Sequence, residues 1–242
     1  MSVDRPILTP ANPPGLRDLP FELPKVTAAQ KRRAHALADA LALAYPDAHC
    51  ELNYTTPHEL LIATILSAQS TDAGVNKATP GLFTAFPTPR EYALATPEQI
   101  EPYIKRIGLY RNKARSVHEA MLAVVERFGG QVPQTMDELL SLRGVARKTA
   151  NVVLGNAFGI NVGFVVDTHI LRLSVRFGMV EEGATPLATE KQLMALMPRE
   201  KWCTLSHQFI WHGRRACIAR VRRCAAHPVC EQFGKCCEAR RS

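Results

Sequence analysis

The chain has 242 residues and a hydrophobic content of 46%, which is enough for a packed core and excludes a wholly disordered protein. Thirty Lys and Arg residues outnumber 22 Asp and Glu residues, and the resulting net charge of +8 favours a polyanionic partner such as nucleic acid. The net charge alone does not exclude an anionic membrane surface as the partner. No apolar run approaches the ~20 residues that cross a bilayer, and the N-terminus lacks the pattern of a secretory signal, so we expect a cytoplasmic protein.

Residues 1–25 carry six of the 17 prolines and few large apolar residues. Such a segment cannot bury enough surface to offset its ordering entropy. We therefore expect a mobile, proline-rich arm at the N-terminus.

Helix-start signals recur after this arm. The capping-box spacing, in which Thr precedes Glu or Gln by three positions, occurs at Thr27 with Gln30, Thr56 with Glu59, Thr96 with Gln99 and Thr135 with Glu138. Apolar residues repeat at helical spacing between these points, whereas the one strand-like stretch, 162–166, is too short to build a sheet. The sequence predicts an all-α fold of about ten short helices.

Residues 139–153 read as a short helix, a turn at Gly144 and a second amphipathic helix. This is the helix-hairpin-helix pattern, although an ordinary αα-turn has the same spacing. In such a hairpin the first amides of the second helix point outward and suit a phosphate oxygen. The contact would not depend on base sequence.

Lys148 falls in the first turn of that second helix, where the helix dipole disfavours a cation. A phosphate contact would explain its position. Catalysis would also explain it, because an amine near positive N–H groups deprotonates more easily, as a lysine nucleophile requires. The spacing from Gly144 to Thr149 is not that of an ATP-binding loop, which excludes that reading.

Asp167 follows an apolar stretch and precedes a predicted helix over 170–177. Aspartate is a favoured helix N-cap, so this position has a structural explanation as well as a catalytic one. His169 beside it is equally compatible with a structural role.

Five of the seven cysteines crowd into 21 residues near the C-terminus: Cys217, Cys224, Cys230, Cys236 and Cys237. Disulfides are not expected in a reducing cytosol. Neighbouring arginines favour thiolates and metal binding. The paired C-x2-C knuckles of structural zinc are missing, and four well-spaced thiolates favour an iron–sulfur cluster over zinc.

Taken together, these motifs resemble the endonuclease III family, which comprises DNA glycosylases and AP lyases of the helix-hairpin-helix superfamily. The resemblance runs from about Thr27 to Cys236 and rests on five blocks in the family's order: 66–72 (LSAQSTD), 108–114 (GLYRNKA), 143–154 (RGVARKTANVVL), 166–170 (VDTHI) and 212–214 (HGR) leading to Cys217.

The resemblance implies two domains. A six-helix barrel domain would occupy 50–161 and contain the hairpin at about 137–157. Residues 26–49 and 162–242 would form a smaller helical domain around a [4Fe–4S] cluster, and DNA would lie across the cleft between them.

The resemblance also assigns roles to residues. Lys148 would be the catalytic lysine and Asp167 the catalytic aspartate, Gln69 would fill the space left by the extruded base, and Leu109 would wedge the opposite strand. The other expected DNA contacts are Arg143, Gly144, Val145, Ala146, Arg147, Thr149 and His169. The expected cluster ligands are Cys217, Cys224, Cys230 and Cys236, with Cys237 as a substitute for the last.

Two features depart from the family pattern. Arg143 and Ala146 replace a proline and a glycine of the usual hairpin, which affects how tightly the turn is preset. Three extra residues separate Cys224 from Cys230, and His227 stands where the third cysteine is expected.

By resemblance, the protein is a monomeric bacterial enzyme of base excision repair, associated with the nucleoid. It would remove oxidised pyrimidines from duplex DNA through a lysine Schiff base and cut the strand 3′ to the abasic site. The alternatives are a monofunctional adenine-mismatch glycosylase, against which Lys148 argues, and a non-enzymatic DNA-binding module, which would leave Asp167 and the Gln69 block unexplained. A third alternative is an iron–sulfur redox sensor.

Overall fold

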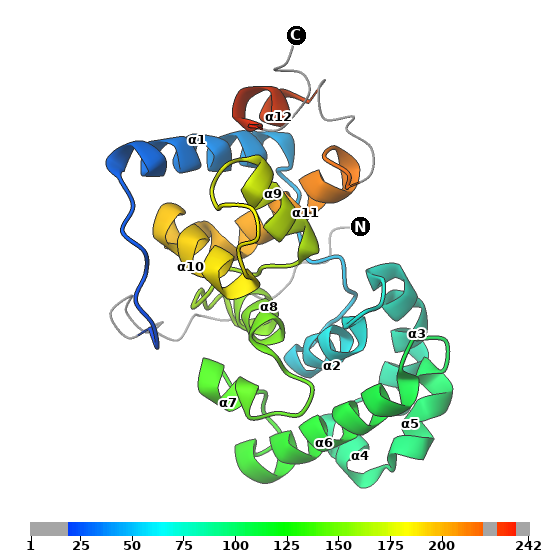
Figure 1. The fold of residues 1–242 in the computed structure, drawn as a ribbon. Helices are drawn as coiled ribbons and strands as arrows, with labels where there is room; N and C mark the ends of the chain where they lie inside the picture. The colour runs from blue at the N-terminus through cyan, green and yellow to red at the C-terminus, as the bar shows by residue number, and fades with distance from the viewer. Residues whose placement is uncertain (1–18, 220–226, 236–242) are drawn as a thin grey trace. The chain divides into compact units, whose positions relative to one another are not determined.

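The computed structural model describes residues 19–219 and 227–235, and in this part of the chain it contains twelve α-helices, one 3₁₀ helix and no strand (Figure 1). The predicted all-α class is confirmed. None of the helices within those ranges is long and apolar enough to span a membrane. The chain divides into two compact units, Cys50–Ile160 and the described parts of Pro13–His49 and Asn161–Ser242.

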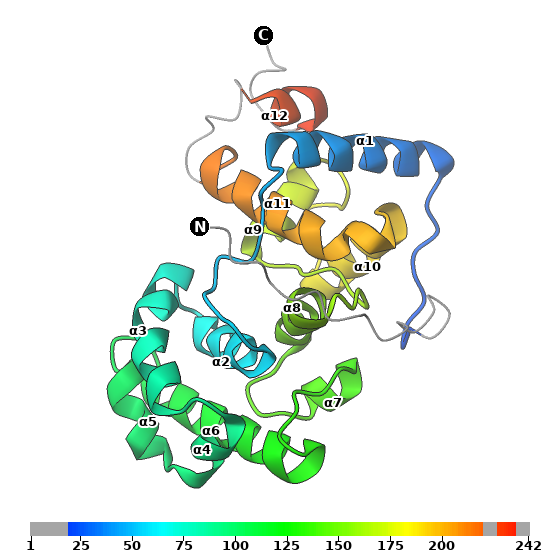
Figure 2. The same ribbon diagram turned by 180° about the vertical axis from the view of Figure 1, so that it is seen from behind.

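The first unit is built around a buried helix. All seven residues from Leu60 to Leu66 of α2 are buried, which is typical of a helix enclosed on every side. It packs against α3, α6 and α8, while α6 also packs against α4 and α5 (Figure 2). The helices of this unit are α2 (Pro57–Ser67), α3 (Asp72–Ala85), α4 (Pro89–Leu94), α5 (Pro97–Ile104), α6 (Tyr110–Phe128), α7 (Met136–Leu140) and α8 (Arg147–Phe158).

The second unit joins segments far apart in the sequence. Its helix α1 packs against α10, α11 and α12, and α9 packs against α11. At its centre the ring of Phe209 meets Phe164 and Phe177 edge to face, with centroids 6.1 and 6.0 Å apart. The elements are α1 (Ala28–Ala44), α9 (Thr168–Arg176), α10 (Pro186–Leu196), the 3₁₀ helix η2 (Arg199–Lys201), α11 (Trp202–Arg215) and α12 (Pro228–Phe233).

Threonine caps begin many of these helices, as the sequence predicts. The Thr27 hydroxyl accepts from the backbone N–H of Gln30 at 3.2 Å, and the Gln30 side chain accepts from the N–H of Thr27 at 2.8 Å. The boxes at Thr56 and Thr96 also form, and Thr135 caps α7. A further box, Thr88 with Glu91 at α4, was not predicted, although it has the same spacing.

The expectation of a mobile arm over 1–25 needs correction for its last part. Residues 1–18 lie outside the described part of the chain. Beyond them, Leu19, Phe21 and Leu23 pack against the core of the second unit. These contacts favour attachment of the segment to the domain, because they remove part of the three apolar side chains from water.

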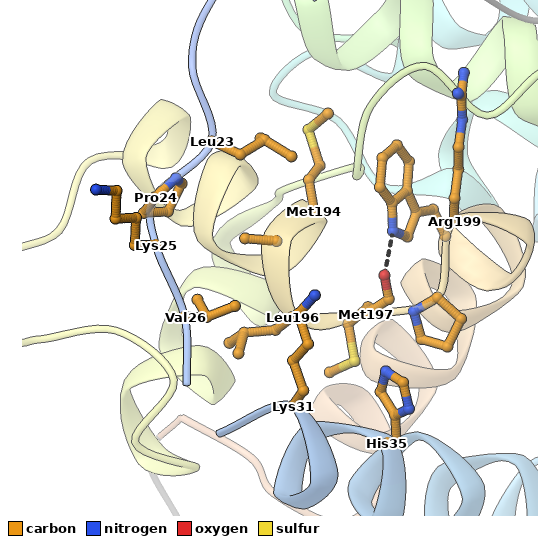
Figure 3. A pocket seen from close by; sticks show the side chains of 13 residues that line it. Leu23, Pro24, Lys25, Val26, Lys31, His35, Met194, Leu196, Met197 and Arg199 are labelled. Carbon is orange, nitrogen blue, oxygen red and sulfur yellow. Dashed lines mark hydrogen bonds between the residues drawn. The ribbon is translucent and has the colours of Figure 1, made fainter. Parts of the chain in front are cut away.

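Next to this segment lies a cavity of about 710 Å³, shown in Figure 3. Its walls come from the extended chain at Leu23–Val26, from α1 and from the end of α10, and the indole N–H of Trp202 donates to the carbonyl of Met197 at 3.0 Å. None of the residues that the sequence assigns to DNA, catalysis or metal lines this cavity. The predicted site residues therefore lie outside this cavity.

Candidate active site and metal centre

The predicted hairpin is formed by α7, a tight turn and α8. Gly144 in the turn has φ +78°, a left-handed conformation that side chains rarely adopt. A Cβ atom at this position would lie 3.0 Å from Cβ of Ser116 on α6. The turn therefore needs glycine both for its backbone angle and for its close approach to α6.

The N-terminus of α8 has no side-chain cap. Its N-cap residue is Ala146, which has no side-chain oxygen, whereas threonines cap α1, α2, α3 and α7. First-turn amides without a side-chain cap, together with the positive end of the helix dipole, favour an anion such as a phosphate oxygen. This end of α8 therefore has the features expected of the phosphate contact.

Lys148 lies on the first turn of α8 and its side chain is exposed. Its neighbours Arg147 and Thr149 are half-buried, and Val145 is buried under the turn. An exposed amine contributes nothing to the core, so packing does not explain Lys148. It is free to reach a bound substrate.

Arg143, which replaces the usual proline of the hairpin, forms an ion pair with Glu119 of α6. The Arg143 Nη1 atom lies 2.9 Å from a carboxylate oxygen of Glu119. This pair ties the turn to α6, although an exposed pair of this kind contributes at most about 1 kcal/mol. A contact between Arg143 and DNA would compete with Glu119 for the guanidinium.

Gln69 and Leu109 share an unusual backbone conformation. Their φ angles are +54° and +59°, and they are the two non-glycine residues of the described chain with positive φ. Both are exposed, Leu109 by 59%. Such strain persists only where surrounding structure holds it, and it is common at functional sites. The sequence motifs singled out both residues but gave no sign of their strain.

Asp167 is the N-cap of α9 in the second unit. Its Oδ1 atom accepts a hydrogen bond from the backbone N–H of Ile170 at 2.8 Å. The interpretation of Asp167 as a helix cap is thus confirmed. The cap fixes the direction of the carboxylate, and the catalytic role stays a prediction.

His169 lies on α9 where this helix meets α11. A Cβ atom on Gly213 would come within 3.0 Å of Cβ of His169, so Gly213 allows the two helices to approach closely. Burial lowers the pKa of His169, with Asp167 opposing the shift and Arg172 and Arg214 adding to it. The lowered pKa favours the neutral imidazole in the protein without DNA.

A potential metal centre lies where α11 ends and α12 begins. Cys217, Cys230 and His212 are buried, and their ligand atoms lie within 4.8 Å of one another. The structure thus brings together two of the four predicted ligands, while Cys224, Cys236 and the substitute Cys237 lie outside the described residues. Cys50 and Cys203 do not belong to the group. His212 was not predicted as a neighbour of these thiols, although it stands five positions before Cys217.

The two thiols of this centre lie among hydrogen-bond donors. The pKa of Cys217 is held well below its usual range by the hydrogen bond from Cys230 and also by those from His212 and Arg176. The Arg176 guanidinium lies 3.0 Å from Sγ of Cys217, and Nε2 of His212 lies 3.1 Å from Sγ of Cys230. Thiolates are the form that binds metal, so this environment fits a metal centre.

His227, which stands at the expected position of the third cysteine, does not belong to this group. Its Nδ1 accepts from the backbone N–H of Val229 and caps α12. Its Nε2 lies 3.2 Å from the hydroxyl of Tyr45, which also lies 2.9 Å from Nδ1 of His212. His227 is thus linked to His212 through the hydroxyl of Tyr45.

Comparisons with known proteins agree with this geometry. Residues 62–199 match the pattern of the HhH-GPD superfamily of base excision DNA repair proteins. Endonuclease III of Synechocystis is 48% identical over 197 residues, which cover 81% of this chain and 90% of that protein. Endonuclease III of Escherichia coli K12 is 42% identical over 181 residues, covering 75% of this chain and 85% of its own.

Solved structures show the same similarity. A trapped covalent intermediate of an endonuclease III with DNA is 41% identical, has a TM-score of 0.82, and is matched over 90% of this chain and 100% of its own. A thermostable thymine-DNA glycosylase at 21% identity and a TM-score of 0.78 shares the fold. This chain belongs to the endonuclease III family, within the HhH-GPD superfamily of base excision DNA repair proteins.

Proposed function

We propose that the protein removes oxidised pyrimidines from duplex DNA and cuts the strand 3′ to the resulting abasic site, with Lys148 as the nucleophile. As a member of the endonuclease III family it is a DNA glycosylase and AP lyase. The observation that carries the finer proposal is the exposed Lys148 on the first turn of α8, next to an uncapped helix N-terminus. A similar endonuclease III has been trapped as a covalent intermediate with DNA, which requires a nucleophile on the protein.

The chemistry begins with extrusion of the target nucleotide, because a base inside a duplex cannot be reached. The Lys148 amine attacks C1′ of the sugar, and the base leaves with the electrons of the glycosidic bond. Loss of a proton from nitrogen and opening of the sugar give a Schiff base. The Schiff base acidifies C2′, and loss of that proton expels the 3′ phosphate by β-elimination.

Asp167 has the complementary role in this proposal. Its carboxylate would stabilise the positive charge that develops on the sugar and would help to move protons. The cap bond to Ile170 holds the group in a fixed orientation, and a preorganised charge stabilises a transition state better than a mobile one.

DNA binding would rest on the hairpin and on the two strained residues. The first amides of α8, with Arg147 and Thr149, would hold a phosphate without reading sequence. Gln69 would fill the space that the extruded base leaves, and Leu109 would separate the bases of the opposite strand. Both side chains are exposed, as this requires.

We also propose that the buried cysteine centre holds a [4Fe–4S] cluster through Cys217 and Cys230 together with Cys224 and Cys236. Two buried thiols with a guanidinium and an imidazole against their sulfurs fit such a group. When bound, the cluster would supply a cross-link between the end of α11 and α12. The reaction steps above use only protein side chains.

The deciding experiment is the reaction of the full-length protein with a duplex that contains one thymine glycol, in the presence of borohydride. Borohydride reduces a Schiff base to a stable amine, so we expect a covalent protein–DNA adduct and, without borohydride, a cut strand. Lys148→Gln should abolish the adduct and base release, while binding to the damaged duplex stays within about threefold because an exposed cation contributes little.

Lys105→Gln is the matched control, since Lys105 is an exposed lysine of the same unit at the end of α5. It should behave as wild type. An adduct that persists in Lys148→Gln would assign the nucleophile to another amine. A wild-type protein that binds the duplex but forms no adduct would favour the non-enzymatic alternative.

A further inference from the structure

We propose that Lys113 and Ser70 form a positioning pair that holds Gln69 and Leu109 in their strained conformations, so that the two residues enter the duplex together. The inference rests on the proposed function, since it assumes that Gln69 and Leu109 act at the extruded base. It concerns the first unit alone.

Lys113 contacts both loops through a single side chain and its own backbone. It lies on the first turn of α6, and its N–H donates to the carbonyl of Leu109 at 3.0 Å, which is the ordinary i→i−4 bond at the start of the helix. Its ammonium reaches across to the loop between α2 and α3 and donates to Oγ of Ser70 at 2.8 Å. Because Ser70 follows Gln69 directly, one residue links the two strained positions.

The strain at these positions needs such a link. A left-handed conformation is unfavourable for a residue with a side chain, and an isolated exposed loop would relax out of it. The Ser70 N–H also donates to the carbonyl of Ser67 at 3.0 Å, which closes the loop behind Gln69. The Ser70 side chain is thus the point at which α6 can hold this loop.

The presence of a lysine at position 113 supports a positioning role rather than a packing role. Lys113 is only 6% exposed, and burial lowers the pKa of its ammonium. In the described chain its one side-chain hydrogen-bond partner is the neutral hydroxyl of Ser70. Burying a charge with so little compensation is unfavourable, and an apolar side chain of similar length would fill the same space more stably.

The pair should act at the extrusion step. Binding of an undamaged duplex depends on the hairpin amides, which Lys113 does not touch. Extrusion requires one side chain to enter the vacated space while the other separates the opposite strand. A loop that has lost its connection to α6 would present Gln69 in many orientations, and the extruded state would form more slowly.

The test measures extrusion by the fluorescence of 2-aminopurine placed beside a thymine glycol, because this base brightens when it loses its stacking partner. We expect Ser70→Ala to slow the fluorescence rise and single-turnover base release about tenfold, with affinity for undamaged duplex within twofold of wild type. Ser70→Thr, which keeps the hydroxyl, should restore most of the rate.

The matched control is Thr84→Val, which removes a hydroxyl bonded to a backbone carbonyl, that of Pro80, at the far end of α3. It should leave the extrusion rate unchanged. Lys113→Met provides a second way to remove the bond. It should slow extrusion like Ser70→Ala, and the double variant should be no slower than the slower single variant, because both act through one bond.

A further experiment distinguishes a positioning role of Ser70 from a general effect of its loss on the structure. In a Gln69→Ala background, Ser70→Ala should add little, since the side chain it positions is gone. A full additional tenfold loss there would overturn the inference, and so would a wild-type extrusion rate in Ser70→Ala and Lys113→Met. A wild-type protein without base release or borohydride adduct would instead overturn the proposed function.

Discussion

The Asp167 carboxylate caps a helix and is also the proposed catalytic group. Its Oδ1 atom caps α9, which any good capping residue could do. A catalytic role would require the negative charge as well as the oxygen. The two roles can therefore be separated by a substitution that keeps the cap and removes the charge.

We predict that Asp167→Asn lowers the single-turnover rate of base release about 100-fold, because the charge opposite the forming sugar cation is lost. The thermal midpoint should stay close to that of wild type, since asparagine caps helices as well as aspartate does. Asp167→Ala, which loses both cap and charge, should lose the rate and about 1 kcal/mol of stability. A normal rate in Asp167→Asn would leave the residue as a helix cap only.

Lys113 and Lys148 differ in burial and in hydrogen bonding, and these differences decide which role each lysine can have. Both are lysines in the first turn of a helix. One is buried and bonded to a neighbouring loop, and the other is exposed beside an uncapped helix end. For this reason we propose a positioning role for Lys113 and covalent chemistry for Lys148.

At the scale of elements, the hairpin depends on contacts with α6. Gly144 lies against Ser116, and Arg143 pairs with Glu119. Of the two departures from the family hairpin, Arg143 is thus held by a neighbouring helix, whereas Ala146 leaves the start of α8 without a side-chain cap. Gly144 is the position that this arrangement constrains most.

We predict that Gly144→Ala destabilises the protein by about 1–3 kcal/mol, because alanine is strained at φ +78° and its methyl group meets Ser116. The change should also weaken binding to duplex DNA, since it moves the first amides of α8. Chemical denaturation and a binding titration measure the two effects. As a control, Gly108→Ala meets no atom within 4 Å and has no positive φ, so it should cost less stability.

A second prediction at this scale concerns His58 on the first turn of α2. Burial lowers the pKa of His58, although the nearby carboxylates of Glu59 and Glu91 and the carbonyl of Pro87 oppose the shift. The folded state therefore binds fewer protons at this site than the unfolded state, and stability falls as the pH drops below the ordinary value of 6.5.

The measurement is the thermal midpoint of the wild type and of His58→Gln between pH 8 and pH 5. The wild type should lose more stability across this range than the variant, because glutamine does not titrate. His118→Gln serves as a control for an imidazole in the same unit. Parallel curves for wild type and His58→Gln would show that this imidazole is not responsible.

At the scale of the whole molecule, the second unit depends on connections between distant segments. Arg33 of α1 donates to the carbonyls of Phe177 and Phe233, each at 2.7 Å, and so joins the ends of α9 and α12. The cysteine centre connects α11 and α12 at a separate point. A cluster held there would add a covalent connection to these weaker ones.

We predict that the purified protein is brown, with a broad absorption shoulder near ~400 nm. Cys217→Ser or Cys230→Ser should bleach the colour and lower the thermal midpoint, as should replacement of Cys224 or Cys236, because loss of the metal group removes folding energy. Cys50→Ser and Cys203→Ser should keep both the colour and the iron content. A colourless wild type with stoichiometric zinc would contradict the prediction.

Most of the local features, such as caps and turns, could be predicted from the sequence, whereas few of the contacts between distant segments could. Threonine caps, the glycine turn at Gly144 and the capping position of Asp167 depend on residues within a few positions of one another, and each is present in the structure. The packing of Leu19, Phe21 and Leu23 was not anticipated, because their partners lie elsewhere in the chain. The neighbours of the thiols, His212 and Arg176, were missed for the same reason.

Short segments of the chain encode the helical class, the helix starts, the hairpin and the family motifs, because caps, turns and motif spacing are local properties. Three further facts emerge from the folded chain: Gln69 and Leu109 share a strained backbone, Lys113 joins their loops, and Arg143 is paired with Glu119. Those facts depend on contacts between residues 24–43 positions apart. Such contacts form when helices pack, and no periodicity within a segment encodes them.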